Sequence, residues 1–244
     1  MNRILQVLPA VIIILVLCFA AQAQEEGVGI TGKGIKLGAT WGSLNTNDSV
    51  FEAGAAGGFT GGAFLTYNIT PRLAIQPELI YVQKGTGDNN FFYGDGYNLG
   101  YLELPVLLKY NLSPDTRLVP SVFFGPAVST LLSAEIYDDH FFGDDEVYDV
   151  KDGMKNVDFG LVFGGEVAFR STRPVRFFFD VRYTLGLVNV VDPVKWSEGR
   201  EISDEGDYWL GPFLIHWTEY NRPEIKEDAY IKNRAFTFLI GIRF

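Results

Sequence analysis

Six charged residues stand within segments that otherwise alternate apolar and polar side chains, and these residues could do chemistry. In an enclosed site, acidic and basic side chains can relay protons, form an ion path, or pair with one another and fill an interior. Which of these applies depends on the elements that hold the charges and on the surface that those elements face. The six residues are Glu78, Glu103, Lys109, Glu166, Asp180 and Arg182.

Two other features could support different chemistry. Residues 138–146 carry several carboxylates, which are ligands that calcium prefers, but the spacing of an EF-hand loop is absent and acidic runs are usually solvated. Both histidines, His140 and His216, fall in predicted loops and neither stands with Ser or Asp in a catalytic signature. We therefore expect no enzyme activity, no cofactor and no metal site, with calcium binding by 138–146 as the alternative.

The last segment, Ala235 to Phe244, shows what kind of element holds such charges. Large apolar residues occupy every second position, and small or polar residues stand between them. Strand side chains alternate between two faces, so one face of this strand is fit for lipid and the other is not. A single strand leaves its backbone groups unpaired in hydrocarbon, and the pattern therefore requires a closed barrel.

Seven earlier segments repeat this alternation, which predicts eight strands in all. Short turns that contain proline, at 69–72, 111–116 and 170–174, alternate with long loops at about 43–57, 85–98, 133–156 and 189–233. This layout predicts an all-β fold, an eight-stranded antiparallel up-and-down transmembrane β-barrel with short periplasmic turns and long extracellular loops. The strands are expected at 35–42, 59–69, 73–81, 101–110, 118–128, 157–169, 175–187 and 235–244.

A soluble eight-stranded barrel also alternates, and the polarity of the two faces separates the two possibilities. A soluble barrel has a dry apolar interior, whereas here the face opposite the apolar one carries the six charges and Arg243. Aromatic residues such as Tyr110 and Phe177 lie near the short turns, and Trp41 and Tyr183 lie about one membrane thickness away. Both observations favour a bacterial outer-membrane protein.

The N-terminus predicts export. Arg3 precedes an apolar stretch from Ala10 to Ala21, and the small residues before Gln24 fit cleavage after Ala23. Because Gln6 and Pro9 interrupt the segment, it is too short to be a transmembrane anchor. We expect residues 1–23 to be a signal peptide, 24–33 a short extension, and 34–244 the barrel domain.

The mature chain would be acidic and free of thiols. Its formal charge would be -11, and the only cysteine, Cys18, lies in the signal segment. A nucleic-acid partner is excluded because phosphate neutralisation requires clustered Lys and Arg.

Four prolines conflict with regular strands. Each removes a backbone donor where a closed barrel has no free edge, so we expect bulges or kinks at these positions. They are Pro77, Pro105, Pro120 and Pro126.

Several segments in order resemble one family. Residues 73–85 and 101–110, the Gly125-Pro126 pair, residues 158–160 and the segment 180–187 are similar to consecutive strands of the PorT-like outer-membrane β-barrel family. The resemblance implies an eight-stranded barrel in a Gram-negative outer membrane. It implies little about activity, since one member is tied to a secretion apparatus and most have no assigned role. The loop 189–233 is longer than the last loop that is usual in this family.

Two functions remain open at this point. Eight strands enclose only enough room for side chains, so we expect the six charges to form an ion-paired plug, with Arg182 balancing Glu166 or Asp180. A structural or interaction role follows, either presenting surface loops or supporting an envelope or secretion complex. The alternative is a narrow channel or transporter for small solutes.

The expected partners follow from the membrane setting. They are outer-membrane lipid and lipopolysaccharide, the barrel-assembly machinery, for which Phe244 would be the signal, and an envelope protein bound through 189–233. Within that loop, the aromatic run 208–217 is expected to fold back over the barrel mouth, the alternative being an exposed docking patch.

Overall fold

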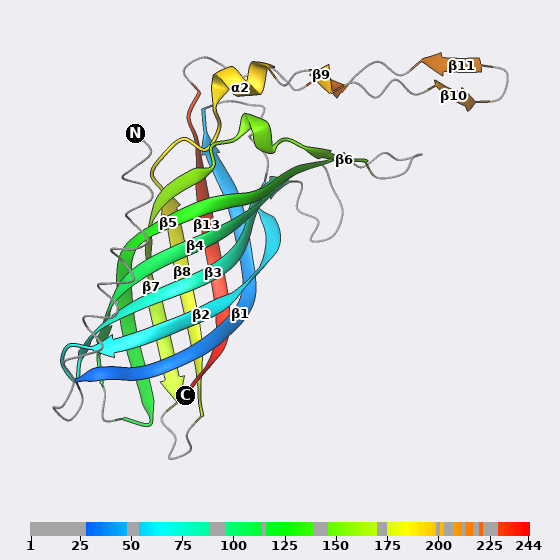
Figure 1. Cartoon of the computed structure of the whole chain (residues 1–244). Coiled ribbons are helices and arrows are strands. Elements are labelled where there is room, and N and C mark those ends of the chain that lie inside the picture. The colour runs from blue at the N-terminus through cyan, green and yellow to red at the C-terminus, as the bar shows by residue number, and fades with distance from the viewer. Residues whose placement is uncertain are drawn as a thin grey trace.

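Eight long strands form the body of the protein in the computed structural model (Figure 1). They are β1 (Gly29–Thr46), β2 (Ala56–Asn68), β3 (Leu73–Gly87), β4 (Gly96–Asn111), β5 (Leu118–Asp138), β7 (Val157–Phe169), β8 (Arg176–Gly186) and β13 (Ile231–Arg243). The structure describes residues 28–47, 54–87, 96–113, 116–138, 146–169, 175–198, 201–202, 207–210, 213–216, 220–221 and 229–244.

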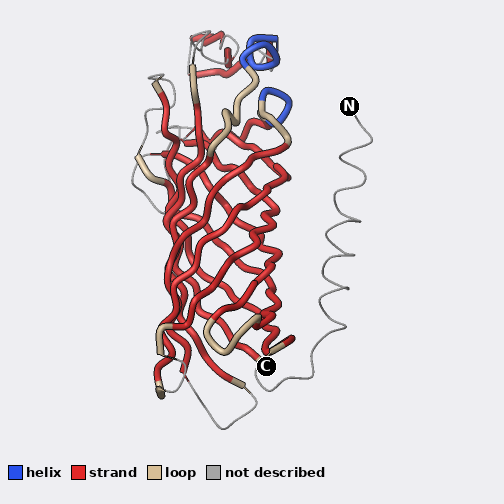
Figure 2. The backbone as a smooth tube through the Cα atoms, turned by 90° about the vertical axis from the view of Figure 1, so that its left-hand side faces the viewer, coloured by secondary structure: helices blue, strands red, loops and turns tan. Residues whose placement is uncertain are grey.

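The strands close into a barrel. Each is antiparallel to its neighbour in the chain, the last strand β13 pairs with β1, and β4 pairs with β5. The pairing of β1 with β13, which is the seam that closes the barrel, runs from Gly34 opposite Arg243 to Thr46 opposite Ile231. Figure 2 shows the strands inclined to the barrel axis all the way round. The predicted eight-stranded antiparallel barrel is confirmed, and no backbone edge is left along this seam.

The two faces of the strands separate as the alternation predicts. Leu37, Phe124 and Phe177 are each about 60% exposed, while their neighbours Lys36 and Phe123 are buried. Large apolar side chains cover the outside of the barrel and most of the charged ones lie inside it, which is the reverse of a soluble barrel. The outer face is therefore the lipid-facing surface.

Several strands are longer than their patterns indicated. β1 begins at Gly29, before position 34. Its first residues were not predicted as strand because they are glycine-rich and because a register shift between Ile30 and Gly32 breaks their alternation. At the other end, β5 continues to Asp138 and pairs there with the short strand β6 (Glu146–Asp149).

The expectation of bulges at the prolines was wrong. Pro77 lies opposite Val106 and Pro105 lies opposite Ala127, and the strand register is the same before and after each of these pairs. A few residue pairs next to each proline are missing from the ladder. β5 also runs past Pro120 and Pro126 without a shift in its pairing with β7. The barrel thus accommodates the missing backbone donor by omitting a few pairs from the strand ladder, without a change of register. The register shifts lie at Ile30/Gly32 and Gly100/Tyr101 instead.

The connections differ in size as predicted. At the end where Asn68, Asn111 and Phe169 finish their strands the turns are short. At the opposite end the chain forms η2 (Lys151–Gly153), α2 (Pro193–Glu198), and two small separate sheets, β9 (Glu201–Ile202) with β12 (Tyr220–Asn221) and β10 (Asp207–Leu210) with β11 (Phe213–His216).

The aromatic run 208–217 overlaps the hairpin β10–β11, which pairs with no barrel strand among the described residues. Helix α2 and the turn η2 cover the mouth in its place (Figure 1). Within the part of the chain that the structure describes, no helix combines the length and the apolar character needed to cross a membrane.

Candidate functional site

The candidate site is the polar interior of the barrel. All six charged residues singled out from the sequence point inward, and each is less than 5% exposed. They are distributed over β3, β4, β7 and β8, so each is far in sequence from most of its neighbours in space. Closure of the barrel brings them together in three clusters stacked along its axis.

The central cluster joins two cations and two carboxylates. Lys36 Nζ lies 2.6 Å from Glu78 Oε1 and 3.1 Å from Asp180 Oδ2. Arg182 donates from Nη1 to Glu78 Oε2 at 2.7 Å and from Nε to Asp180 Oδ1 at 3.0 Å, and its Nη2 also contacts Asp180. Both carboxylates therefore contact both cations, an arrangement that compensates the burial of four charges.

Polar and aromatic side chains surround the central cluster. Gln76 Nε2 donates to Glu78 Oε1 at 2.7 Å, and Gln76 Oε1 accepts from Thr66 Oγ1 at 3.0 Å. The guanidinium of Arg182 lies 5.2 Å from the centre of the Phe123 ring. These contacts hold the side chains in one arrangement, and both carboxylate oxygens of Glu78 accept hydrogen bonds.

A second cluster lies toward the short turns. Glu166 Oε1 is 2.6 Å from Lys109 Nζ and 3.0 Å from Arg243 Nη2. The Arg243 guanidinium lies beside the rings of Phe64 and Phe178, at 5.3 and 5.4 Å from their centres.

The expected pairing of Arg182 with Glu166 is not found. Glu166 stands directly opposite Asp180 on the neighbouring strand, and the two carboxylates have separate cations. Glu166 is held by Lys109 and Arg243, while Asp180 is held by Lys36 and Arg182. Sharing Arg182 between them would leave other buried charges without a partner.

The third cluster lies toward the long loops. Lys84 Nζ is 2.6 Å from Glu103 Oε2, which also accepts from Ser129 Oγ at 3.2 Å. Nearby, Asn233 Nδ2 donates to Asp158 Oδ2 at 2.8 Å and to Tyr101 Oη at 3.1 Å.

Four interior charges were not among the six. Arg243 and Asp158 stand on the face that was expected to point inward but were not assigned to the network, and Lys36 and Lys84 were missed. Each stands at an inward position of the alternation, for example Lys36 between the outward Ile35 and Leu37. Extending the alternation of inward and outward positions along the whole of each strand would therefore have placed all four inside. With them, the cations and carboxylates of these three clusters are equal in number among the described residues.

An apolar cluster closes the mouth above the third cluster. Trp196 of α2 is 1% exposed, and Met154 pairs with Val191 in an isolated β-bridge. Val190 N donates to Ile231 O at 2.9 Å, which fastens this connection to β13. The cluster consists of Leu44, Ile80, Val82, Leu99, Tyr101, Leu131, Ala134, Ile136, Val150, Met154, Val190, Val191, Trp196 and Ile231.

Replacing Trp196 by alanine is expected to loosen this cap without unfolding the barrel. The strand ladders do not pass through α2, so the loss of a buried indole acts on local opening. Amide exchange at Val190 and Lys155, whose N–H groups bond to Ile231 O and Val190 O, should become roughly tenfold faster or more.

The matched control for the cap is Val194→Ala on the same helix, because Val194 is 64% exposed. It should leave exchange at Val190 unchanged. Equal exchange rates in the two variants would mean that Trp196 does not hold the cap.

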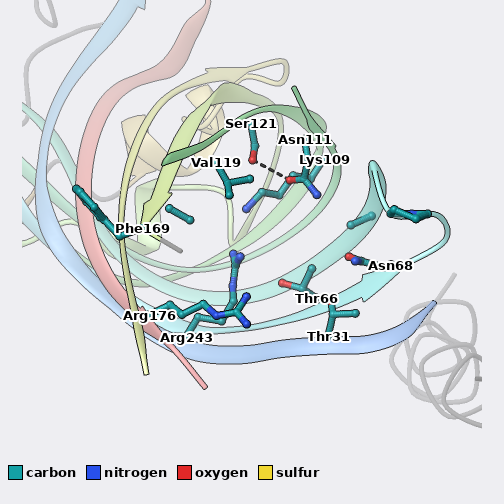
Figure 3. A pocket seen from close by; sticks show the side chains of 13 residues that line it. Thr31, Thr66, Asn68, Lys109, Asn111, Val119, Ser121, Phe169, Arg176 and Arg243 are labelled. Atoms are coloured by element: carbon teal, nitrogen blue, oxygen red, sulfur yellow. Dashed lines mark hydrogen bonds between the residues drawn. The ribbon is translucent and has the colours of Figure 1, made fainter. Parts of the chain in front are cut away.

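At the opposite end the interior widens into a cavity of about 200 Å³ (Figure 3). Its wall includes Lys109 and Arg243 of the second cluster, Arg176 at the start of β8, and the polar side chains of Asn111 and Ser121. The barrel is thus apolar and covered at one mouth and polar and hollowed at the other.

Some predicted sites lie outside the described residues. These are Ala23 and Gln24 of the cleavage site, residues 139–145 of the acidic loop, and the side chain of His216. Among the described residues no group of three or more His, Cys, Asp or Glu side chains is placed to hold a metal ion. Phe244 is described: its backbone pairs with Lys33, and Lys33 Nζ lies 5.7 Å from the centre of its ring.

The solved structures that resemble the chain include neisserial surface protein A, with 13% identity over 88% of this chain and 97% of that one and a TM-score of 0.47. The outer membrane protein OprG of Pseudomonas aeruginosa has 12% identity over 91% and 99% of the two chains and a TM-score of 0.43. No curated protein matches the sequence.

The chain also matches a sequence family over most of its barrel. The family model described as outer membrane protein beta-barrel domain matches residues 22–192, which is more than half of the chain. The match runs through the first seven barrel strands and the connections between them. The chain therefore belongs to the outer membrane protein beta-barrel domain family and is a protein of the bacterial outer membrane.

Proposed function

We propose that this outer-membrane barrel has a structural or interaction role, presenting its long surface loops or supporting an envelope or secretion complex, and that it neither conducts solutes nor catalyses a reaction. The observation that carries the proposal is the pairing of charges across the lumen. Lys36, Glu78, Asp180 and Arg182 come from three strands and meet at contacts of about 3 Å or less.

The energetics of the interior support a closed barrel. An ion passing through would have to separate buried pairs, and each cation removed from its carboxylate leaves an uncompensated charge that costs roughly 3 to 5 kcal/mol. The apolar cap over the long-loop mouth adds a second barrier, because its buried side chains offer an ion no ligands.

A conductance measurement tests the closed lumen. The purified protein should migrate at different apparent masses with and without heating, show that its chain begins at Gln24, and produce no conductance steps in a planar bilayer. A known porin inserted under the same conditions is the positive control. Regular conductance steps from the folded protein would replace the structural role with the narrow channel or transporter.

The interaction part of the proposal places the partner at 189–233. Within this connection Val194 is 64% exposed on α2, beyond the covered mouth, where a protein could reach it. The similarity of the strand motifs to the PorT-like family supports an envelope or secretion complex as the setting. Phe244 would serve the barrel-assembly machinery, and lipid and lipopolysaccharide would surround the apolar outer face.

Photo-crosslinking in intact cells tests this placement. A crosslinking residue at position 194 should give an adduct with a distinct envelope protein, whereas one at position 37, on the lipid face, should give none. Adducts of the same protein from both positions would indicate chance collisions. The absence of any adduct from position 194 would count against a partner at this loop.

A further inference from the structure

The cavity at the short-turn end gathers positive charge that no part of the closed-barrel role uses. Lys109 and Arg243 line it from β4 and β13, and Arg176 lines it from the start of β8. Figure 3 shows Arg176 and Arg243 extending from one side and Lys109 facing them from the other. Glu166 pairs with Lys109 and Arg243 but not with Arg176, so the three cations have one carboxylate beside them among the described residues.

Two of these cations have buried donors that lack an acceptor. Lys109 is 2% exposed, and its Nζ is paired only with Glu166 Oε1, at 2.6 Å, so this contact leaves the remaining N–H groups of the ammonium without an acceptor among the described residues. Arg243 Nε is also buried without an acceptor. Buried donors are almost always satisfied in native structures, so these N–H groups call for an acceptor that enters the cavity.

The backbone register adds a second reason for an anion. Arg243 of β13 stands directly opposite Arg176 of β8. Like charges opposite each other across two strands are destabilising. Among the described residues no carboxylate pairs with Arg176, and a negative group between the two guanidinium groups would turn their repulsion into attraction.

We propose that this cavity binds a phosphate dianion, either free or as a monoester, from the periplasmic side. The site's excess of two positive charges matches a dianion, and guanidinium groups bind phosphate oxygens in pairs. Asn111 Oδ1 accepts from Ser121 Oγ at 2.8 Å, so the amide Nδ2 of Asn111 remains available as a neutral donor. A volume of about 200 Å³ admits a phosphate with several waters.

The site is a closed recess and not an entrance to a channel. Lys109 lines the cavity and pairs with Glu166 behind it, and the central cluster with Glu78 and Arg182 fills the lumen beyond them. Binding at this site is therefore separate from the closed-lumen proposal, and a barrel that conducts could still hold the anion.

Equilibrium dialysis of the full protein in a detergent without phosphate groups tests the proposal. Radiolabelled inorganic phosphate should bind one to one, methyl phosphate should compete with it, and dimethyl phosphate, a monoanion, should not. Arg176→Gln should weaken binding about tenfold or more, because a charge-assisted contact is lost. Arg72→Gln, an exposed arginine of the neighbouring turn that does not line the cavity, should leave binding unchanged.

Three outcomes would overturn the proposal. The absence of saturable phosphate binding by the folded protein would mean that water alone satisfies the buried donors. Equal weakening by Arg176→Gln and Arg72→Gln would indicate diffuse attraction to a basic rim. Undiminished binding by Arg243→Gln, shown to be folded by its heat-dependent migration, would place the phosphate elsewhere. Competition by methyl phosphate separates a monoester site from one that accepts only the free ion.

Discussion

Replacing Arg182 by alanine is expected to lower the free energy of unfolding by roughly 3 to 5 kcal/mol. Arg182 is 4% exposed and contacts both Glu78 and Asp180. Without it, two buried carboxylates share the single ammonium of Lys36, and one negative charge is left uncompensated. The removal of one partner from a buried pair is costly because the other charge cannot return to water.

Urea titration of the protein folded into lipid vesicles measures this effect. The control is Arg72→Ala, because Arg72 is exposed in the turn between β2 and β3 and its removal should cost less than about 0.5 kcal/mol. The double variant Arg182→Ala/Asp180→Asn should recover part of the loss, since it removes a cation and a carboxylate together.

Two results would contradict the assignment of Arg182. Equal shifts of the unfolding midpoint in Arg182→Ala and Arg72→Ala would mean that Arg182 is not held in a buried network. Unchanged stability together with a new conductance would mean that the interior charges form a gate, and the channel would then replace the structural role.

Replacing Leu37 by arginine is expected to destabilise the barrel by roughly 2 to 4 kcal/mol. Leu37 is 59% exposed on the outer face. Along β1 it lies midway between Lys33, beside Phe244 at the short-turn end, and the outward Trp41 near the other interface. A guanidinium at this depth faces hydrocarbon and has no partner there.

The cost of a lipid-facing charge depends on depth, which supplies the control. Ile69→Arg places the same charge beside the short turn, where Ile69 is 39% exposed, and should cost only about 0 to 1 kcal/mol. Both variants can be titrated with urea in the same vesicles. If Leu37→Arg costs no more than Ile69→Arg, the outer face of β1 does not lie at the centre of the bilayer.

The sequence determined the number of strands and the face of each. The alternation from Phe236 to Phe244 is a local property, because neighbouring strand side chains point to opposite sides whatever the strand pairs with. A one-residue error would turn the whole apolar set inward, so the pattern specifies the faces strongly. For the same reason Glu78, Glu103 and Arg182 could be placed inside before any pairing was known.

The strand ends and irregularities followed less well from the sequence. Lys84 was missed because the alternation that defines β3 was followed only to Tyr81, although the strand continues to Gly87. The bulges lie at Gly100/Tyr101 and Ile30/Gly32 and not at prolines, because a bulge depends on how two strands fit together over their whole length.

Only the tertiary structure decided which charges meet. Lys36 and Asp180 are 144 residues apart and lie 3.1 Å from each other, while Glu166 and Asp180, directly opposite across two strands, have different cations. Contacts of this kind depend on the stagger and tilt with which the sheet closes, and on the depth that each side chain reaches inside the lumen. Periodicity along one strand carries no information about these quantities, because they arise only when all eight strands have closed around a common axis.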